Sequence, residues 1–151
     1  MSSTAYSGTT LYAGFWRRVI AVIIDGIVVD VAGGIVLAAL AAVVGSPETD
    51  DGAIRPVFIL VALLFVVGVW LYWTLMESGP AQATLGKQAL SIKVTDHDGN
   101  RLGFGRANGR FFAKIISYMV PFGVAFMMAG WTAKKQALHD MIAGTLVIRS
   151  L

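Results

Sequence analysis

A long apolar run, interrupted by two aspartates, constrains this chain more than any other feature of its sequence. From Val19 to Val44 the ionisable residues are Asp25 and Asp30, and Phe15-Trp16-Arg17-Arg18 leads directly into the run. Roughly 20 apolar residues in a helix, at about 1.5 Å per residue, cross the hydrocarbon core of a bilayer. The run is longer than that, so it predicts a membrane-spanning helix.

The charges of this helix differ in how they can be paired. Arg18 and Asp25 are separated by about two helical turns, so they fall on one face and an ion pair between them is geometrically allowed. Asp30 is rotated by about 140° from Asp25 and lies near the middle of the bilayer, where a lone carboxylate costs several kcal/mol. Asp30 is therefore expected to need a partner, water or a proton.

Composition agrees with an integral membrane protein and argues against several other classes. Of the 151 residues, 56% are hydrophobic and 14% are charged, which is too apolar for a soluble domain of this size. The net charge of +3 fits basic residues flanking membrane helices, and no nucleic-acid partner is expected. The lack of cysteine excludes disulfides and thiolate sites.

The segments around a second apolar run complete the predicted topology. Residues 1–12 lack apolar periodicity and are expected to form a flexible tail, whereas residues 13–151 are expected to form a single membrane domain. Gly45 to Pro56 is an acidic loop, expected outside the cell, and Val57 to Met76 predicts a second spanning helix. The basic residues predict that both termini are cytoplasmic.

A third apolar segment, residues 115–133, allows two models. It is just long enough to span, but Pro121-Phe122-Gly123 divides it near its middle. A straight third helix would place Lys134, Lys135 and Arg149 outside, against the preference of basic residues for the cytoplasm. A re-entrant hairpin would return them to the cytoplasm, and it is the favoured model.

The polar part of the chain predicts a small amount of β-structure. Leu90 to Thr95 alternates apolar and polar residues, an Asp98-Gly99 turn follows, and the alternation resumes at Leu102 and Phe104. This pattern predicts a cytoplasmic β-hairpin at the membrane surface. Residues 145–148 predict a C-terminal strand, which is expected to pair with residues 92–94.

Basic residues recur with helical spacing after this hairpin. Arg106, Arg110 and Lys114 are spaced four residues apart among aromatic and aliphatic residues, which predicts an amphipathic helix whose basic face contacts lipid headgroups. Thr84-Leu85-Gly86-Lys87 lacks the earlier glycine of a phosphate-binding loop. No nucleophile–base pair or zinc motif was found, so we expect no enzymatic activity, no metal and no cofactor.

Several blocks, in order along the chain, resemble the RDD family of bacterial membrane proteins. They are Gly14-Phe15-Trp16-Arg17-Arg18, Ile24-Asp25, Thr84 with Gly86-Lys87, Val94 with Asp98-Gly99, Arg110, and Leu138-His139-Asp140 with Gly144-Thr145 and Val147. Leu85 departs from the family pattern, which often has proline there. The resemblance covers residues 13–148.

Family resemblance implies a compact bundle of a few helices in the bacterial plasma membrane, and the family is only loosely associated with transport. The arginine and two aspartates for which the family is named would be Arg18, Asp25 and Asp140. Arg17 is the other candidate for the arginine position. Together with the apolar runs, this predicts an all-α membrane protein with two spanning helices, a third apolar segment, a small β-hairpin and a C-terminal strand.

Two functions fit the predicted charges. The residues expected to form a network or relay are Arg17, Arg18, Asp25, Asp30, Glu77, His139 and Asp140. As a network, they would fix the helices in register, because stranding one partner of a buried ion pair costs roughly 3 to 5 kcal/mol. As a relay, they would serve an oligomeric proton-linked cation or solute transporter. The favoured function is a structural or accessory protein whose partners are membrane lipids and another membrane protein or a second copy.

Overall fold

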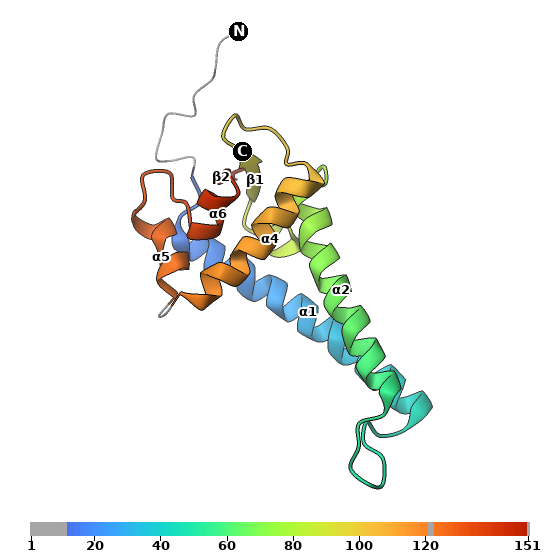
Figure 1. The fold of residues 1–151 in the computed structure, drawn as a ribbon. Coiled ribbons are helices and arrows are strands. Elements are labelled where there is room, and N and C mark those ends of the chain that lie inside the picture. Colours follow the sequence, from blue (N-terminus) through green and yellow to red (C-terminus); the bar gives the residue numbers. More distant parts are fainter. Residues whose placement is uncertain (1–11, 121–122, 151) are drawn as a thin grey trace.

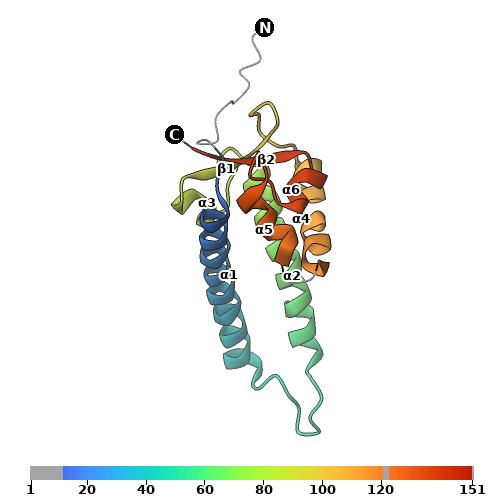
Figure 2. The ribbon, with the colours of Figure 1, turned by 90° about the vertical axis from the view of Figure 1, so that its left-hand side faces the viewer.

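Two long helices and a smaller group of elements at one end of them make up the fold (Figures 1 and 2). The computed structural model describes residues 12–120 and 123–150. Helices α1 (Phe15–Val44) and α2 (Pro56–Ser78) carry the apolar runs, and both are long and apolar enough to cross a membrane. The two predicted spanning helices are confirmed in this sense. The tail predicted for residues 1–12 falls, apart from residue 12, outside the described residues.

The remaining elements gather at the end of the spans opposite the loop that joins α1 to α2 (Figure 2). We call residues 79–149 the head. Its elements are α3 (Leu85–Ala89), β1 (Ile92–Asp96), α4 (Phe104–Met119), α5 (Val124–Trp131), α6 (Leu138–Ile142) and β2 (Thr145–Arg149). The protein is therefore mostly helical, with a single two-stranded sheet among its described residues.

The spans turn large apolar side chains outward over most of their length. Examples are Ile27 and Ile35 in α1 and Leu63 and Val66 in α2, all of them exposed in the isolated chain. Lipid would cover these side chains in a membrane, so their exposure costs nothing there. Between the spans, Gly33 of α1 lies against the ring of Phe65 in α2, where a Cβ would be only 2.9 Å from the nearest ring atom.

The C-terminal strand pairs with the first strand, as the sequence predicts. β1 and β2 are antiparallel, with Val94 opposite Val147 and Lys93 opposite Ile148. The chain entering α1 joins this sheet, since the Ala13 N–H donates to the Val147 carbonyl oxygen at 2.9 Å. Buried apolar residues form the core at this junction; they are Ala13, Ala21, Ile92, Val94, Leu102 and Val147. The sheet is thereby fastened to the beginning of the first span.

The predicted β-hairpin is wrong in its second strand. A turn does follow β1, because the Asp96 carboxylate accepts hydrogen bonds from the backbone N–H groups of Asp98 at 2.9 Å and Asn100 at 2.8 Å. Beyond the turn, Leu102 enters the core and Phe104 begins α4. β2 takes the place beside β1 that residues 102–104 were predicted to fill.

The third apolar segment is divided into two helices, α4 and α5, that meet at 108°. Such a pair is either a broken span or a re-entrant loop. Gly123 precedes α5 with a φ of +64°, in the left-handed region that glycine adopts without strain. Pro121 and Phe122, where the hairpin was predicted to turn, lie outside the described residues. The described part of the segment is not a single straight helix.

Gly86 allows the closest approach between the head and the spans. A Cβ at this position would lie 2.1 Å from the Ala21 carbonyl oxygen in α1 and 3.0 Å from the carboxyl carbon of Asp25. Real Cβ atoms do not come this close to a backbone oxygen, so any larger residue must push α3 away from α1.

Gly86→Ala should therefore destabilise the protein, by about 2 to 3 kcal/mol. The measurement is the thermal unfolding midpoint of purified protein in detergent. Gly105→Ala is the matched control, because it also adds a methyl group to a helical glycine but meets no atom within 4 Å. Equal midpoints for the two variants would contradict the described packing of α3 on α1.

Candidate functional site

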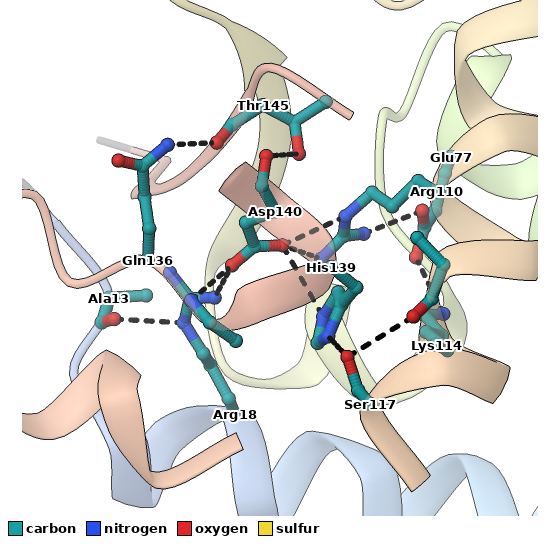
Figure 3. A network of polar contacts seen from close by, with 12 residues as sticks. Ala13, Arg18, Glu77, Arg110, Lys114, Ser117, Gln136, His139, Asp140 and Thr145 are labelled. Carbon is teal, nitrogen blue, oxygen red and sulfur yellow. Dashed lines mark hydrogen bonds and ion pairs between the residues drawn. The ribbon is translucent and has the colours of Figure 1, made fainter. Parts of the chain in front are cut away.

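Asp140, in α6, lies at the centre of a set of buried ion pairs (Figure 3). Its Oδ1 accepts hydrogen bonds from Arg110 Nε at 2.9 Å and Arg110 Nη2 at 2.6 Å. Its Oδ2 accepts from Arg18 Nη1 and from the backbone N–H of Ala137 at 3.1 Å. Burial alone would raise the pKa of the Asp140 carboxyl, but Arg110 and Arg18 hold this pKa far below its usual range.

Glu77, in the last turn of α2, is the second acid of the set. Its Oε2 accepts a hydrogen bond from Arg110 Nη1 at 2.6 Å, so this arginine bridges two carboxylates. Its Oε1 accepts from Lys87 Nζ and lies 3.6 Å from Lys114 Nζ. We call these six residues the ion-pair network: Arg18, Glu77, Lys87, Arg110, Lys114 and Asp140.

The ion-pair network connects five helices that are distant in sequence. Arg18 comes from α1, Glu77 from α2, Lys87 from α3, Arg110 and Lys114 from α4, and Asp140 from α6. Arg18 also donates to the carbonyl oxygens of Ala13, at 3.0 Å, and Lys135. The network therefore links the head to both spans through side chains from the two spans and from α3, α4 and α6.

The network holds four cations against two carboxylates. Lys87 shares Glu77 with two other cations and is buried. Burial lowers the pKa of Lys87 to about 7, because the attraction of Glu77 only partly offsets desolvation and the repulsion of Arg110 and Lys114. Lys87 therefore gives up its proton more readily than an exposed lysine does.

Asp25 anchors the beginning of α3 through hydrogen bonds. Its Oδ1 accepts from the Tyr72 hydroxyl and from the backbone N–H of Gly86, both at 2.8 Å, and its Oδ2 accepts from the Thr84 hydroxyl at 2.5 Å. The Tyr72 hydroxyl in turn accepts from the Leu85 N–H at 3.0 Å. One carboxylate and one phenol therefore fix α3 against both spans.

The predicted ion pair between Arg18 and Asp25 is wrong. Helical spacing places both residues on one side of α1, but Arg18 extends toward the head and pairs with Asp140. Asp25 faces α3, and no cation in the described part of the chain lies within 4.0 Å of it. Of the three residues that the family resemblance singles out, two form one ion pair and the third forms a separate hydrogen-bonded anchor.

His139 borders the network in a neutral state. Its Nε2 lies 3.4 Å from Asp140 Oδ1 and its Nδ1 lies 3.4 Å from Ser117 Oγ. Burial lowers the pKa of His139 to about 3, since the attraction of Asp140 is opposed by Arg110, Lys114 and Arg18.

Two predicted members do not join the network. Arg17 is exposed, and its guanidinium donates to the Leu90 carbonyl oxygen at 3.4 Å, with no described carboxylate within 4.0 Å. Asp30 is exposed on the surface of α1 within the span, and no described lysine, arginine or histidine comes within 4.0 Å of its carboxylate. Asp30 therefore faces whatever surrounds α1 in the membrane.

The predicted basic face of α4 is wrong at Arg110, which points inward and is 2% exposed. Lys114 turns toward Glu77 and lies over the ring of Trp73, whereas Arg106 is exposed and pairs loosely with Asp96 at 3.7 Å. The helix is amphipathic as predicted, but part of its polar face turns inward, where Arg110 and Lys114 provide counter-charges for Glu77 of α2 and Asp140 of α6. Its outward side chains are mainly apolar; they include Phe112, Ile115, Ile116 and Met119.

Sequence reasoning did not identify Lys87, Thr84 and Tyr72 as members of the site. Thr84 and Lys87 were noted in the family pattern but given no role. All three are buried or partly buried polar groups near an acid. Within residues 12–120 and 123–150, no cluster of histidine, aspartate and glutamate has the arrangement of a metal site.

A sequence model of the RDD family matches residues 12–144. The chain belongs to the RDD family. The uncharacterized protein YxaI of Bacillus subtilis (strain 168) is 35% identical over 90% of this chain and 96% of its own length. From the same organism, the uncharacterized membrane protein YteJ is 25% identical over 93% of this chain and 82% of its own. No solved structure matches. This chain is thus an RDD-family membrane protein, and its relatives' names state no activity.

Removing the charge of Asp140 should be severely destabilising. Asp140→Asn leaves two buried guanidinium groups facing a neutral amide, and the expected loss is about 3 to 5 kcal/mol of unfolding free energy. Arg106→Gln is the matched control, because it breaks an exposed ion pair worth about 0 to 1 kcal/mol. Thermal unfolding in detergent measures both, and a similar small loss in each variant would contradict the network's role.

Protonation of His139 should make the fold acid-sensitive. Its pKa is about 3 when folded, against 6.5 for an ordinary histidine, so the unfolded chain binds the proton more readily. The contribution of neutral His139 to the unfolding free energy is fully present well above pH 6.5. It is lost progressively as the pH falls from 6.5 toward 3. Between about pH 6 and pH 4.5, the unfolding free energy of His139→Gln should therefore fall by about 2 kcal/mol less than that of the wild type. If the unfolding free energies of wild type and variant fall equally across this pH range, His139 is not buried in the neutral state.

Proposed function

We propose that this RDD-family protein is a structural or accessory membrane protein, in which the ion-pair network locks the head onto two spanning helices. The completeness of the bonding at the two buried aspartates carries this proposal. Asp140 accepts four hydrogen bonds and Asp25 accepts three. A proton or ion relay needs groups that exchange with water, whereas fully bonded, buried carboxylates act as fixed anchors.

Asp30 provides the surface through which such a protein would join a membrane complex. Its carboxylate is exposed on a span, where lipid cannot solvate it. Gly26 and Gly34, four residues before and after Asp30, have no atom within 4 Å of a Cβ position, so another helix can approach closely there. The partner on this face is another membrane protein or a second copy of this chain.

The head is placed in the cytoplasm in this proposal. Of the 12 lysines and arginines, Arg55 alone lies between the two spans, and the other 11 lie in the head or at the adjoining start of α1. Cytoplasmic segments are enriched in these residues. α4 and α5 then form a re-entrant pair, returning Lys134 and Lys135 to the side on which Arg106 lies.

A proton-linked cation or solute transporter is the second candidate. The exposed Asp30 is the specific observation in its favour, because intramembrane acids line ion pathways in transporters. Two spans and a broken pair cannot enclose a pathway alone, so this function would require an oligomer. Asp30 would then face a pathway between the copies.

Cysteine labelling tests the topology, since the natural chain has no cysteine. Single cysteines at Thr49, Asp98 and Ser150 are exposed to a membrane-impermeant thiol reagent on intact cells. Position 49 should be labelled, and positions 98 and 150 only after the cells are opened. Labelling of position 150 in intact cells, with position 98 protected, would contradict the re-entrant pair and support a third span.

Asp30→Asn separates the two functions, because asparagine keeps the shape of aspartate but cannot release a proton. For an accessory protein, the variant should fold normally and leave the flux of protons across proteoliposomes at the level of empty vesicles, as in the wild type. Collapse of an imposed pH gradient by added Na⁺ or K⁺ in wild-type vesicles, absent with Asp30→Asn, would contradict the accessory function. Thr49→Asn, in the connecting loop, is the control.

A further inference from the structure

An apolar groove lies between the start of α1 and α5, on the outside of the protein. It has a volume of about 400 Å³ and is lined by Phe15, Trp16, Met127, Gly130 and Trp131. Trp16 and Trp131 are 73% and 62% exposed, so both rings remain available to a ligand. The start of α1 and α5, which carry the lining residues, lie together at the head end of the first span (Figure 1). Tryptophan favours the boundary between hydrocarbon and headgroups, which is expected near the ends of a span.

Positive charge lies at the edge of this groove. Lys135 Nζ donates to the carbonyl oxygen of Gly130, a lining residue, at 2.6 Å. Two backbone hydrogen bonds hold Lys135 in place. Arg18 of the network donates to its carbonyl oxygen, and its N–H donates to the Thr132 carbonyl oxygen at 3.0 Å. Lys134 is exposed beside it.

These edge cations lack acidic partners within the protein. No carboxylate of the described chain comes within 4.0 Å of Lys135 or Lys134. The buried cations of the network, by contrast, each lie against Glu77 or Asp140. The edge of the groove therefore offers uncompensated positive charge directly beside an apolar surface.

We propose that this groove is a binding site for one anionic phospholipid. An acyl chain fills the space between the two tryptophans, and the phosphate and its anionic headgroup lie against Lys135, with Lys134 adding longer-range attraction. The acyl chain of a zwitterionic lipid would fill the groove, but its headgroup has no net charge to attract the lysines. A free anion would be attracted by the lysines but would leave the groove empty. The ligand that matches both features is an anionic amphiphile of the surrounding membrane.

Quenching of tryptophan fluorescence by brominated lipid tests this proposal. The full chain with Trp70→Phe and Trp73→Phe, which retains the two groove tryptophans, is placed in phosphatidylcholine vesicles. Equal fractions of brominated phosphatidylglycerol or brominated phosphatidylcholine are then compared. The anionic lipid should quench with about fivefold higher apparent affinity, the order expected for one headgroup–ammonium contact.

Matched variants locate the site. Lys135→Gln should reduce the preference for phosphatidylglycerol about fivefold, whereas Lys93→Gln, on the sheet, should leave it unchanged. Gly130→Leu should fill the groove and weaken quenching by both lipids. Native mass spectrometry of the wild-type chain and Lys135→Gln, in detergent with both lipids, measures directly how much of each lipid stays bound. It needs no tryptophan substitution, so all four tryptophans are kept.

Several results would overturn the proposal. They are equal affinity for the two lipids, an undiminished preference in Lys135→Gln, or retention of phosphatidylglycerol by Gly130→Leu at the wild-type level. Quenching that falls as the protein-to-lipid ratio rises would also overturn it, because a second copy would then occupy the groove in place of lipid.

Discussion

Two arginines share one buried carboxylate, and the placement of the head depends on that arrangement. Asp140 draws Arg18 from the first span and Arg110 from α4, and Arg110 carries the connection on to Glu77 in the second span. Buried charges are costly, so such a network adds little net stability over apolar packing. It instead makes one arrangement of the helices acceptable, because any shift would strand a charge. This suits a protein whose apolar surface is turned toward lipid and whose internal apolar core is small.

The elements that the sequence predicts well are those governed by local physics. The length of the apolar runs predicts both spans, alternation predicts β1, and the run at residues 145–148 predicts β2, which pairs with β1 as expected. Contacts between distant elements were harder to predict. Helical spacing offered Arg18 a partner in its own helix, but the true partner is 122 residues away in sequence. Likewise, the basic spacing of α4 is the same whether Arg110 meets a lipid phosphate or a buried acid, and only the fold decides between these.

The described structure divides the charged residues by role. Those of the ion-pair network and Asp25 face inward and are bonded, which agrees with a structural function. Asp30 and the lysines beside the α1–α5 groove have no partner of opposite charge within 4.0 Å in the described chain. The protein's interactions with other molecules are thus expected at these outward sites, one deep in the span for a helix and one at the interface for a lipid. The network also bears on the site at the interface, since Arg18 holds the turn that carries Lys135.

A double-mutant cycle tests the central claim, that Arg18 and Asp140 hold the head on the first span through a direct interaction. Unfolding free energies in detergent are measured for Arg18→Met, Asp140→Asn and the double variant. The account predicts that the double variant is more stable than the sum of the two single losses implies, by about 1 to 3 kcal/mol, because the two changes remove the same contact. Losses that add to within about 0.5 kcal/mol would show that the two residues act independently, and would contradict the account.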